Sequence, residues 1–407
     1  MDSRRKFIGA MATGLASTLA SASSASGAGD VLGADERVRI GLIGAGQRGS
    51  ELLHQALACP NVEIAAVADV YAKRLDDART RVPTAAAYRD HRRLLDDPSI
   101  HAVIIATPQH LHCEHFVASL EAGKHVYQEK TLAFTLDHAK RMRAAYRQAP
   151  KAVVQIGHQA CSSGQTRDAA NFLAGGNVGK ITAIRMHWYR NTPHGKAQWA
   201  RPVYPDMTPE NIVWSSFLGE APRRDFDPHR FINWRFFEEY SGGNVYENLS
   251  QQLAFWYQAL NLQVPHAATM TGGVYLWKDG RDVPDTMNVT FQQPEQMLVS
   301  WDSGLGNNQL GVTEDVLGSD GTISRTSAGI RYVPQKVNRP DGVEAAGKAV
   351  SFPTAHMQNF VECIRSGKEP NCPFELGYRV SIACRMALES FHQGRTVRWD
   401  PRTESIT

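Results

Sequence analysis

Cysteine, long apolar runs and charge of one sign are all scarce in this sequence of 407 residues. The six cysteines show no CxxC or zinc-finger spacing, so we expect buried free thiols rather than disulfides. Beyond the N-terminal region no segment approaches the ~18 consecutive apolar residues of a membrane helix, which predicts no stable membrane insertion. The net charge is only +3, from interspersed acidic and basic residues, and this argues against a nucleic-acid partner. The cysteines are Cys59, Cys113, Cys161, Cys363, Cys372 and Cys384.

The N-terminal residues have the pattern of an export signal. Arg4, Arg5 and Lys6 precede a mildly apolar stretch of small residues that runs to about residue 20. This order is typical of a twin-arginine leader, and small residues at 20–22 and 26–28 offer cleavage sites. We predict a signal peptide over residues 1–29, recognition by the export machinery for folded proteins, and a periplasmic mature chain.

A glycine-rich turn follows an apolar, β-branched run at residues 38–43. Gly44 permits a tight turn, Gly46 lets the backbone approach a pyrophosphate, and Gly49 lets a helix pack closely on the strand. The N-terminus of that helix offers free N–H groups and the positive end of the helix dipole. The residues of this turn that we assign to a dinucleotide are Gly44, Gly46, Gln47, Arg48 and Gly49.

An acidic residue lies where a dinucleotide site needs one. The second predicted strand, residues 62–67, ends close to Asp69, which is 20 residues beyond Gly49. A carboxylate at this position binds the adenosine ribose hydroxyls and repels a 2′-phosphate. We therefore expect NAD rather than NADP as the cofactor, although Arg74 could soften that preference.

Strands and helices alternate up to residue 160, which predicts a doubly wound parallel sheet and a Rossmann domain over residues 36–160. Ligands bind at the carboxyl ends of such strands, so residues at those ends should meet in space. These residues are Thr107, Glu129, Lys130 and His158. The further strands are expected at 102–106, 125–127 and 153–157, and the helices at 112–122 and 136–149.

Several of these motifs resemble the glucose–fructose oxidoreductase / inositol dehydrogenase (Gfo/Idh/MocA) family. The resemblance lies in the turn at 44–49, in Asp69, in the ATPQHLH segment at 106–112 and in GKHVYQEK at 123–130. Weaker matches at 176–181, 359–367 and 394–399 extend it over about residues 37–400. It implies an α/β fold: a Rossmann domain, then a second domain over residues 161–400 built on a large, open, mostly antiparallel sheet.

The resemblance also implies a tightly bound nicotinamide cofactor and a sugar, cyclitol or related polyol substrate. It places Lys130 near the reacting hydroxyl and the nicotinamide, with Glu129 positioning that lysine. A lysine beside NAD⁺ can take up the hydroxyl proton or polarise the oxygen. Thr131 stands where the family usually has proline. Besides the glycine turn and Asp69, the residues that the resemblance assigns to the cofactor are Thr107, Pro108, Gln109, His110, His112, Glu129 and Lys130.

Aromatic residues concentrate in one part of the second half. Residues 186–240 contain twelve of them, interleaved with arginines that include Arg190, Arg201 and Arg230. Aromatic faces stack on sugar rings and arginines bind hydroxyls or carboxylates, so we assign Trp234 and Arg235 to the substrate. A packed loop layer or a subunit contact is the alternative. Strands of this half are expected at 181–189, 274–277, 287–291, 297–301 and 310–317.

The family histidine is missing from the predicted helix at 246–260. Relatives carry an acid and, four residues later, a histidine that accepts the proton; the glycine pair at 242–243 aligns Glu247 with the acid and Gln251 with the histidine. Glutamine cannot act as a base, so Lys130 could act alone. His158, Tyr246, His187 and His194 remain possible substitutes. Our catalytic assignments are Lys130, Glu129, Glu247 and Gln251, and our substrate-binding assignments are Lys130, His158, Trp234, Arg235 and Gln251.

These patterns predict an NAD-dependent oxidoreductase that acts on a hydroxyl of a sugar, cyclitol or glycoside. Two alternatives stay open: an NAD-dependent glycosidase that oxidises its sugar transiently, and a sugar or nucleotide sensor without activity. We expect no metal site, because the resemblance implies that the segment with His110, His112 and His115 begins a helix near the cofactor. A homodimer or homotetramer is expected, because relatives cover their open sheet with another subunit.

Overall fold

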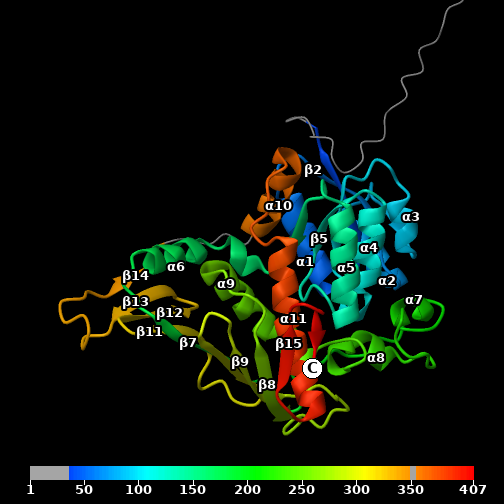
Figure 1. Cartoon of the computed structure of the whole chain (residues 1–407). Helices are drawn as coiled ribbons and strands as arrows, with labels where there is room; N and C mark the ends of the chain where they lie inside the picture. Colours follow the sequence, from blue (N-terminus) through cyan, green and yellow to red (C-terminus); the bar gives the residue numbers. More distant parts are fainter. Residues whose placement is uncertain (1–35, 349–353) are drawn as a thin grey trace, which may run out of the picture.

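The computed structural model describes residues 36–348 and 354–407 (Figure 1). The predicted signal peptide, residues 1–29, lies outside the described residues. Within the two described ranges, no helix combines the length and the apolar character that a membrane crossing requires.

The first sheet consists of six parallel strands in the order β3-β2-β1-β4-β5-β6. Neighbouring β1 and β4 are followed by helices that lie on opposite faces, so a crevice opens beyond their carboxyl ends. This arrangement confirms the predicted doubly wound sheet. The strands are β1 (Val38–Ile43), β2 (Val62–Ala68), β3 (Ala86–Tyr88), β4 (Ala102–Ile105), β5 (His125–Gln128) and β6 (Val154–Ile156).

Two cores cover the two faces of this sheet. One face packs against α1, α2 and α10, and the other against α3, α4, α5 and the start of α11. Helix α10 comes from the far end of the chain, and Met357, Phe360 and Ile364 on it join the same core as Val38 and Ile40. The helices are α1 (Gln47–Leu57), α2 (Ala72–Arg81), α3 (His91–Leu95), α4 (His112–Glu121), α5 (Leu136–Gln148), α10 (Ala355–Ser366) and α11 (Phe374–Gln393).

The second sheet has ten strands in the order β14-β13-β12-β11-β7-β10-β9-β8-β15-β16. Every neighbouring pair is antiparallel except β7 and β10. This confirms the predicted open, mostly antiparallel second sheet. The strands are β7 (Ile181–Tyr189), β8 (Ala267–Gly273), β9 (Thr286–Gln292), β10 (Leu298–Gly304), β11 (Val312–Gly318), β12 (Gly321–Thr326), β13 (Gly329–Pro334), β14 (Ala345–Ala346), β15 (Val397–Asp400) and β16 (Ser405–Ile406).

Helices cover one face of this sheet (Figure 1). Alternate residues such as Met186, Val289 and Trp301 point into the helical side, where α9 and α11 supply apolar partners. The opposite face carries polar side chains, among them Arg185, which donates to Ser300 Oγ at 3.0 Å. Because side chains alternate along a strand, the sheet has an apolar face covered by helices, which we call the dry face, and a polar face, which we call the wet face. The covering helices are α6 (Gly164–Ala174), α9 (Ser250–Leu260) and α11.

One predicted strand, residues 274–277, is wrong. The segment leaves the sheet after β8, and the backbone N–H groups of Tyr275, Leu276 and Trp277 all donate to the buried carboxylate of Asp285. Because these three N–H groups donate to Asp285, they are not free to pair with a neighbouring strand. Tyr275 is 67% exposed in the resulting loop.

Most of the aromatic residues at 186–240 lie in or pack against a separate small core, which we call the aromatic cluster. It contains the buried side chains Tyr71, Met207, Ile212, Phe217, Leu218, Phe231, Phe236, Phe237 and Tyr240. It surrounds α7 (Trp214–Leu218) and α8 (Pro228–Ile232) and packs on the loop after β2 through Tyr71. Most of the aromatic rings at 186–240 therefore belong to a packed layer, which was the alternative to a role in substrate binding. All six cysteines are free and buried, as expected.

Candidate functional site

A cavity of about 1100 Å³ opens beyond the carboxyl ends of β1 and β2. Its floor is the glycine turn, and its far wall comes from the segment that carries the aromatic cluster. The two domains therefore enclose it together. The predicted residues that line it are Gly44, Gly46, Gln47, Arg48, Asp69, Thr107, Pro108, Trp234 and Arg235.

The three glycines differ in what surrounds them. Gly44 has φ +92° and donates its N–H to Ala68 O at 2.8 Å. A Cβ at Gly49 would lie 1.9 Å from Gly44 O, so only glycine lets α1 pack on the turn. A Cβ at Gly46 would meet nothing closer than the Arg74 guanidinium at 3.5 Å. The backbone at Gly46 is thus open toward the cavity, and no side chain caps the N-terminus of α1. This free helix end fits a pyrophosphate.

Asp69 is 6% exposed and already accepts two backbone hydrogen bonds. Its Oδ2 accepts from Ala45 N at 2.7 Å and its Oδ1 from Tyr71 N at 2.9 Å. Arg74 Nη1 lies 3.8 Å from Oδ2. Each carboxylate oxygen keeps a lone pair. The fixed carboxylate and its place in the cavity lining fit recognition of ribose hydroxyls.

His110 and His112, which follow β4, contact backbone carbonyls and do not line the cavity. His112 places its two ring nitrogens 2.8 Å from Thr131 O and 3.0 Å from Thr107 O. His110 Nε2 lies 2.7 Å from Phe217 O, and burial lowers the pKa of His110 to about 4. Both rings tie the loop after β4 to other segments. Among the described residues no group of three or more potential metal ligands occurs.

Glu129 pairs with Arg48 rather than with the amino group of Lys130. Its Oε1 accepts from Arg48 Nε at 2.8 Å and from Gln159 Nε2 at 3.1 Å, while its Oε2 accepts from the Lys130 backbone N–H at 3.1 Å. Burial opposes the charge of Arg48, but the Glu129 carboxylate outweighs it and raises the pKa of Arg48. Glu129 therefore fixes the backbone of Lys130 and the start of α1.

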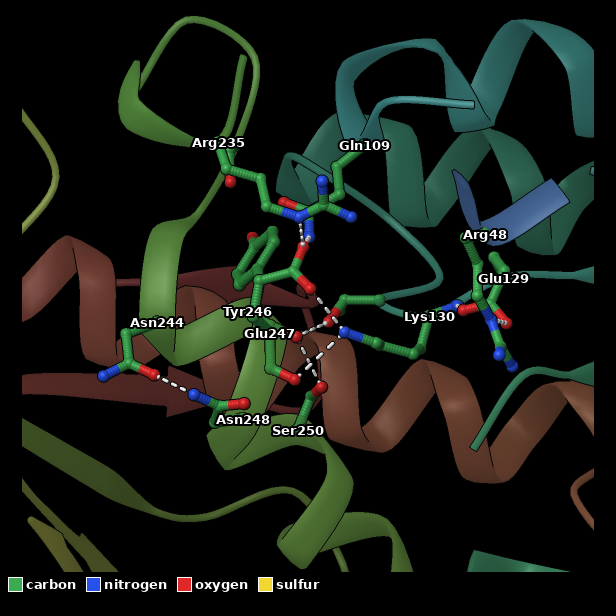
Figure 2. A network of polar contacts seen from close by, with 12 residues as sticks. Arg48, Gln109, Glu129, Lys130, Arg235, Asn244, Tyr246, Glu247, Asn248 and Ser250 are labelled. Carbon is green, nitrogen blue, oxygen red and sulfur yellow. Dashed lines mark hydrogen bonds and ion pairs between the residues drawn. The ribbon is translucent and has the colours of Figure 1, made fainter. Parts of the chain in front are cut away.

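The amino group of Lys130 forms an ion pair with the carboxylate of Glu247 (Figure 2). Lys130 Nζ lies 2.6 Å from Glu247 Oε2 and 3.0 Å from Glu247 O, and its side chain is 13% exposed. The other oxygen, Oε1, accepts from Gln109 Nε2 at 3.0 Å and lies 3.3 Å from Arg235 Nε. Burial alone would raise the pKa of Glu247, but Lys130 and Arg235 lower it to about 2. Glu247 is thus an anion that gathers three donors.

Glu247 lies in a single π-helical turn, Val245–Leu249, which precedes α9. Two carbonyls of this turn accept side-chain donors from the loop after β5: Glu247 O from Lys130, and Tyr246 O from Thr131 Oγ1 at 2.8 Å. Such turns often mark functional sites because they release carbonyls from the helical ladder. Here the released carbonyls join the two domains at Lys130.

Gln251 and His158 lie close to each other, and His158 lies close to Lys130. His158 is fully buried, and neither ring nitrogen has a partner at ordinary hydrogen-bond geometry within the described residues. Burial, the nearby charge of Lys130 and that of His356 lower the pKa of His158 to about 3, while the approach of the Gln251 side chain opposes this. The structure thus brings a neutral imidazole next to Lys130 and Gln251.

The remaining predicted residues extend the cavity wall. Arg235 lies 4.3 Å above the Trp234 ring, and both line the cavity. Arg201 donates to Gln47 Oε1, which links the second domain to the glycine turn. Tyr246 points away and donates to Phe134 O at 2.7 Å. His187 pairs with Asp302 on the wet face of the sheet.

Sequence reasoning missed two contacts of this site. The first is the contact of Gln159 with Glu129. Gln159 follows β6 and His158 directly, so its position at the carboxyl end of a strand could have indicated a place in the site. The pairing of Arg48 with Glu129 spans 81 residues and left no local signal.

Comparison with known proteins agrees with this architecture. Residues 38–158 match the Gfo/Idh/MocA family model, described as an oxidoreductase family with an NAD-binding Rossmann fold. The first domain is therefore an NAD-binding Rossmann domain. Levoglucosan dehydrogenase of Pseudarthrobacter phenanthrenivorans is 28% identical over 212 residues, 49% of this chain and 52% of that protein. Inositol 2-dehydrogenase of Salmonella typhimurium is 28% identical over 185 residues, 45% of this chain and 55% of that protein. The chain thus spans about half the length of these curated relatives.

Solved structures match over more of the chain. A levoglucosan dehydrogenase in complex with NADH and L-sorbose has a TM-score of 0.70 at 19% identity, with 89% of this chain and 99% of that chain covered. The apo scyllo-inositol dehydrogenase from Lactobacillus casei has a TM-score of 0.63 at 16% identity, with 89% and 98% covered. At such identities the likeness establishes the two-domain fold.

Proposed function

We propose that this chain, whose first domain carries the Gfo/Idh/MocA Rossmann fold, is an NAD-dependent oxidoreductase acting on a hydroxyl of a sugar, cyclitol or glycoside. The curated relatives are named as dehydrogenases of levoglucosan and inositol, which supports this substrate class. The observation that carries the proposal is Lys130, held by Glu247 at 2.6 Å beside the nucleotide cavity.

The residues around Lys130 define what it can do. Bound NAD⁺ would accept a hydride, and NADH would donate one. Glu247 stays ionised, and its carboxylate holds the Lys130 amino group in place, where a protonated amino group can give a proton to a developing alkoxide. In the oxidation direction, a neutral Lys130 amino group would take up the hydroxyl proton. Gln251 can hydrogen bond a hydroxyl but cannot take its proton.

The test begins with protein purified without added nucleotide. Mass spectrometry identifies any bound dinucleotide, and absorbance of reduced NAD is followed with a panel of sugars, cyclitols and aryl glycosides. Net reduction by a polyol is the expected result. Release of the aryl group without net reduction would instead favour the glycosidase, and ligand binding with neither reaction would favour a sensor.

We also propose that the mature protein is periplasmic, on the basis of Arg4, Arg5 and the small-residue stretch after them. Replacing both arginines with lysine should leave full-length protein in the cytoplasm. Cell fractionation of the two forms tests this, and unchanged export of the double variant would contradict it.

A further inference from the structure

The Glu247 carboxylate is surrounded by more positive charge than it neutralises. Lys130 and Arg235 contact it directly, at 2.6 Å and 3.3 Å. A third cation, Arg190, follows β7 and lies close enough for Glu247 to act on its charge. The other acid beside Lys130, Glu129, is already engaged by Arg48, and the neighbouring His158 is neutral. Three cations thus share one anion.

The two arginines have unused donors. Arg235 uses Nε toward Glu247, and among the described residues its two terminal nitrogens have no hydrogen-bond partner. The half-buried Arg190 guanidinium stacks 5.3 Å above the Trp188 ring, and the described chain offers it no hydrogen bond or ion pair. Burial lowers the pKa of Arg190, and the charge of Glu247 opposes this only in part. A half-buried cation without a partner is costly, and an anionic ligand removes that cost.

We propose that the substrate is an acidic sugar, whose ring carboxylate is bound by Arg235 and Arg190 while Lys130 faces the reacting hydroxyl. This inference rests on the proposed function, because it names the substrate class of the same site. A carboxylate suits a guanidinium, since two parallel N–H···O bonds fix both its position and its plane. Arg235 already contacts one carboxylate here, that of Glu247, through Nε alone.

The nucleotide is the competing explanation for Arg235, because this residue also lines the cofactor cavity. Arg190 is not part of that lining. Variants of Arg235 and Arg190 can therefore distinguish a contact with the substrate from a contact with the cofactor.

The experiment compares matched substrates that differ in charge. Glucuronate and galacturonate are each measured against the parent sugar and the methyl ester, and glucose 6-phosphate is included. We expect kcat/KM for a uronate to exceed that of its neutral counterparts by at least tenfold. Arg235→Gln and Arg190→Gln should each lower this ratio by at least tenfold. Arg185→Gln is the matched control, because Arg185 lies on β7, the strand that leads to Arg190, but on the wet face, and it should leave the ratio unchanged.

Three results would overturn the inference: equal or better use of the neutral sugars, equal losses for acid and neutral substrates in both variants, or a preference for the sugar phosphate. Loss of NAD affinity in Arg235→Gln with an unchanged ratio would assign Arg235 to the cofactor and overturn its role here. If no sugar is oxidised, the proposed function fails separately. Calorimetry of glucuronate and glucose on the NAD-loaded protein then decides: tighter binding of glucuronate supports the acidic ligand, and equal binding contradicts it.

Discussion

At the scale of single residues, Lys130 lies between two carboxylates that have different tasks. Glu129 holds its backbone N–H and Glu247 holds its amino group. The side chain is therefore fixed at both ends before any ligand arrives. Such fixed geometry is what a proton donor or acceptor needs to act on one particular hydroxyl.

Lys130→Ala should lower kcat at least ~100-fold, because loss of a general acid or base costs about 10²–10⁴ in rate. NAD should still bind, since the amino group contacts Glu247 rather than the cavity lining. Single-turnover reduction of NAD with the best substrate measures the rate, and calorimetry measures cofactor binding. Lys151→Ala, at an exposed position outside the cavity lining, is the control. A near-normal rate in Lys130→Ala would remove the catalytic assignment.

Glu247 should make stability depend on pH. Its pKa is lowered from 4.5 to about 2 in the folded protein, so the stabilisation is complete above the unfolded value and is lost as the pH falls toward 2. The difference in free energy of unfolding between the parent chain and Glu247→Gln should be larger at pH 7 than at pH 3. Urea unfolding at both values measures it, with Glu121→Gln at the exposed end of α4 as control. A difference that does not change with pH would refute the ion pair.

The sequence predicted the members of this site better than their contacts. Lys130, Glu129 and Asp69 follow predicted strands, and the carboxyl ends of parallel strands must converge. Glu247 required the resemblance, because nothing local links it to a lysine 117 residues away. Which carboxylate pairs with Lys130 depends on how the two domains pack, and no pattern within either domain contains that information.

At the scale of elements, two glycines of the same turn have different tasks: Gly49 is needed for packing, and Gly46 for binding the cofactor. Gly49→Ala would place a methyl group against Gly44 O, whereas Gly46→Ala would meet only the flexible end of Arg74. We expect Gly49→Ala to lower both the melting temperature and NAD affinity. Gly46→Ala should keep the melting temperature and lose NAD affinity by at least about tenfold, because its methyl group occupies the pyrophosphate approach. Differential scanning fluorimetry and calorimetry measure the two effects, and equal behaviour of the variants would contradict this reading.

The aromatic cluster should stabilise the cavity wall. Phe217 is buried, and its ring lies 5.0 Å from that of Trp214 and 5.1 Å from those of Phe231 and Tyr240. Phe217→Ala should lower the free energy of unfolding by about 3–5 kcal/mol. Urea unfolding measures this. Tyr275→Ala, at the exposed loop after β8, should change it by less than about 0.5 kcal/mol. A loss as small as that control's in Phe217→Ala would show that the ring is dispensable.

Strand prediction succeeded where apolar and polar residues alternate in the sequence, or where the segment is continuously apolar. β1 and β7 match the predicted bounds. β12 was missed because its segment is rich in Ser, Thr, Arg and Gly. β13 was missed because its few β-branched and aromatic residues lie in a short segment between Gly329 and Pro334. Their place in the sheet comes from pairing with β11, which is a property of the whole domain rather than of the segments.

At the scale of the whole molecule, the wet face of the second sheet is the surface we expect a second subunit to cover. It carries His187 and Tyr189, whose side chains meet Asp302 at 2.6 Å and 2.7 Å. A dimer or tetramer is expected, with a polar, hydrogen-bonded interface. Multi-angle light scattering should give a mass two or four times that of one chain. The mass of a monomer at working concentration would contradict it.

Helix α10 has a consequence for how the protein is made. The core that lies behind the glycine turn is completed by Met357, Phe360 and Ile364, and Arg365 Nη2 donates to Glu36 O across 329 positions. A nascent chain on the ribosome therefore cannot finish its first domain until almost its last residues have emerged. Truncation before α10 should abolish a nucleotide site that lies entirely upstream of the cut. The unit of folding is the complete chain, even though the unit of nucleotide recognition is its first third.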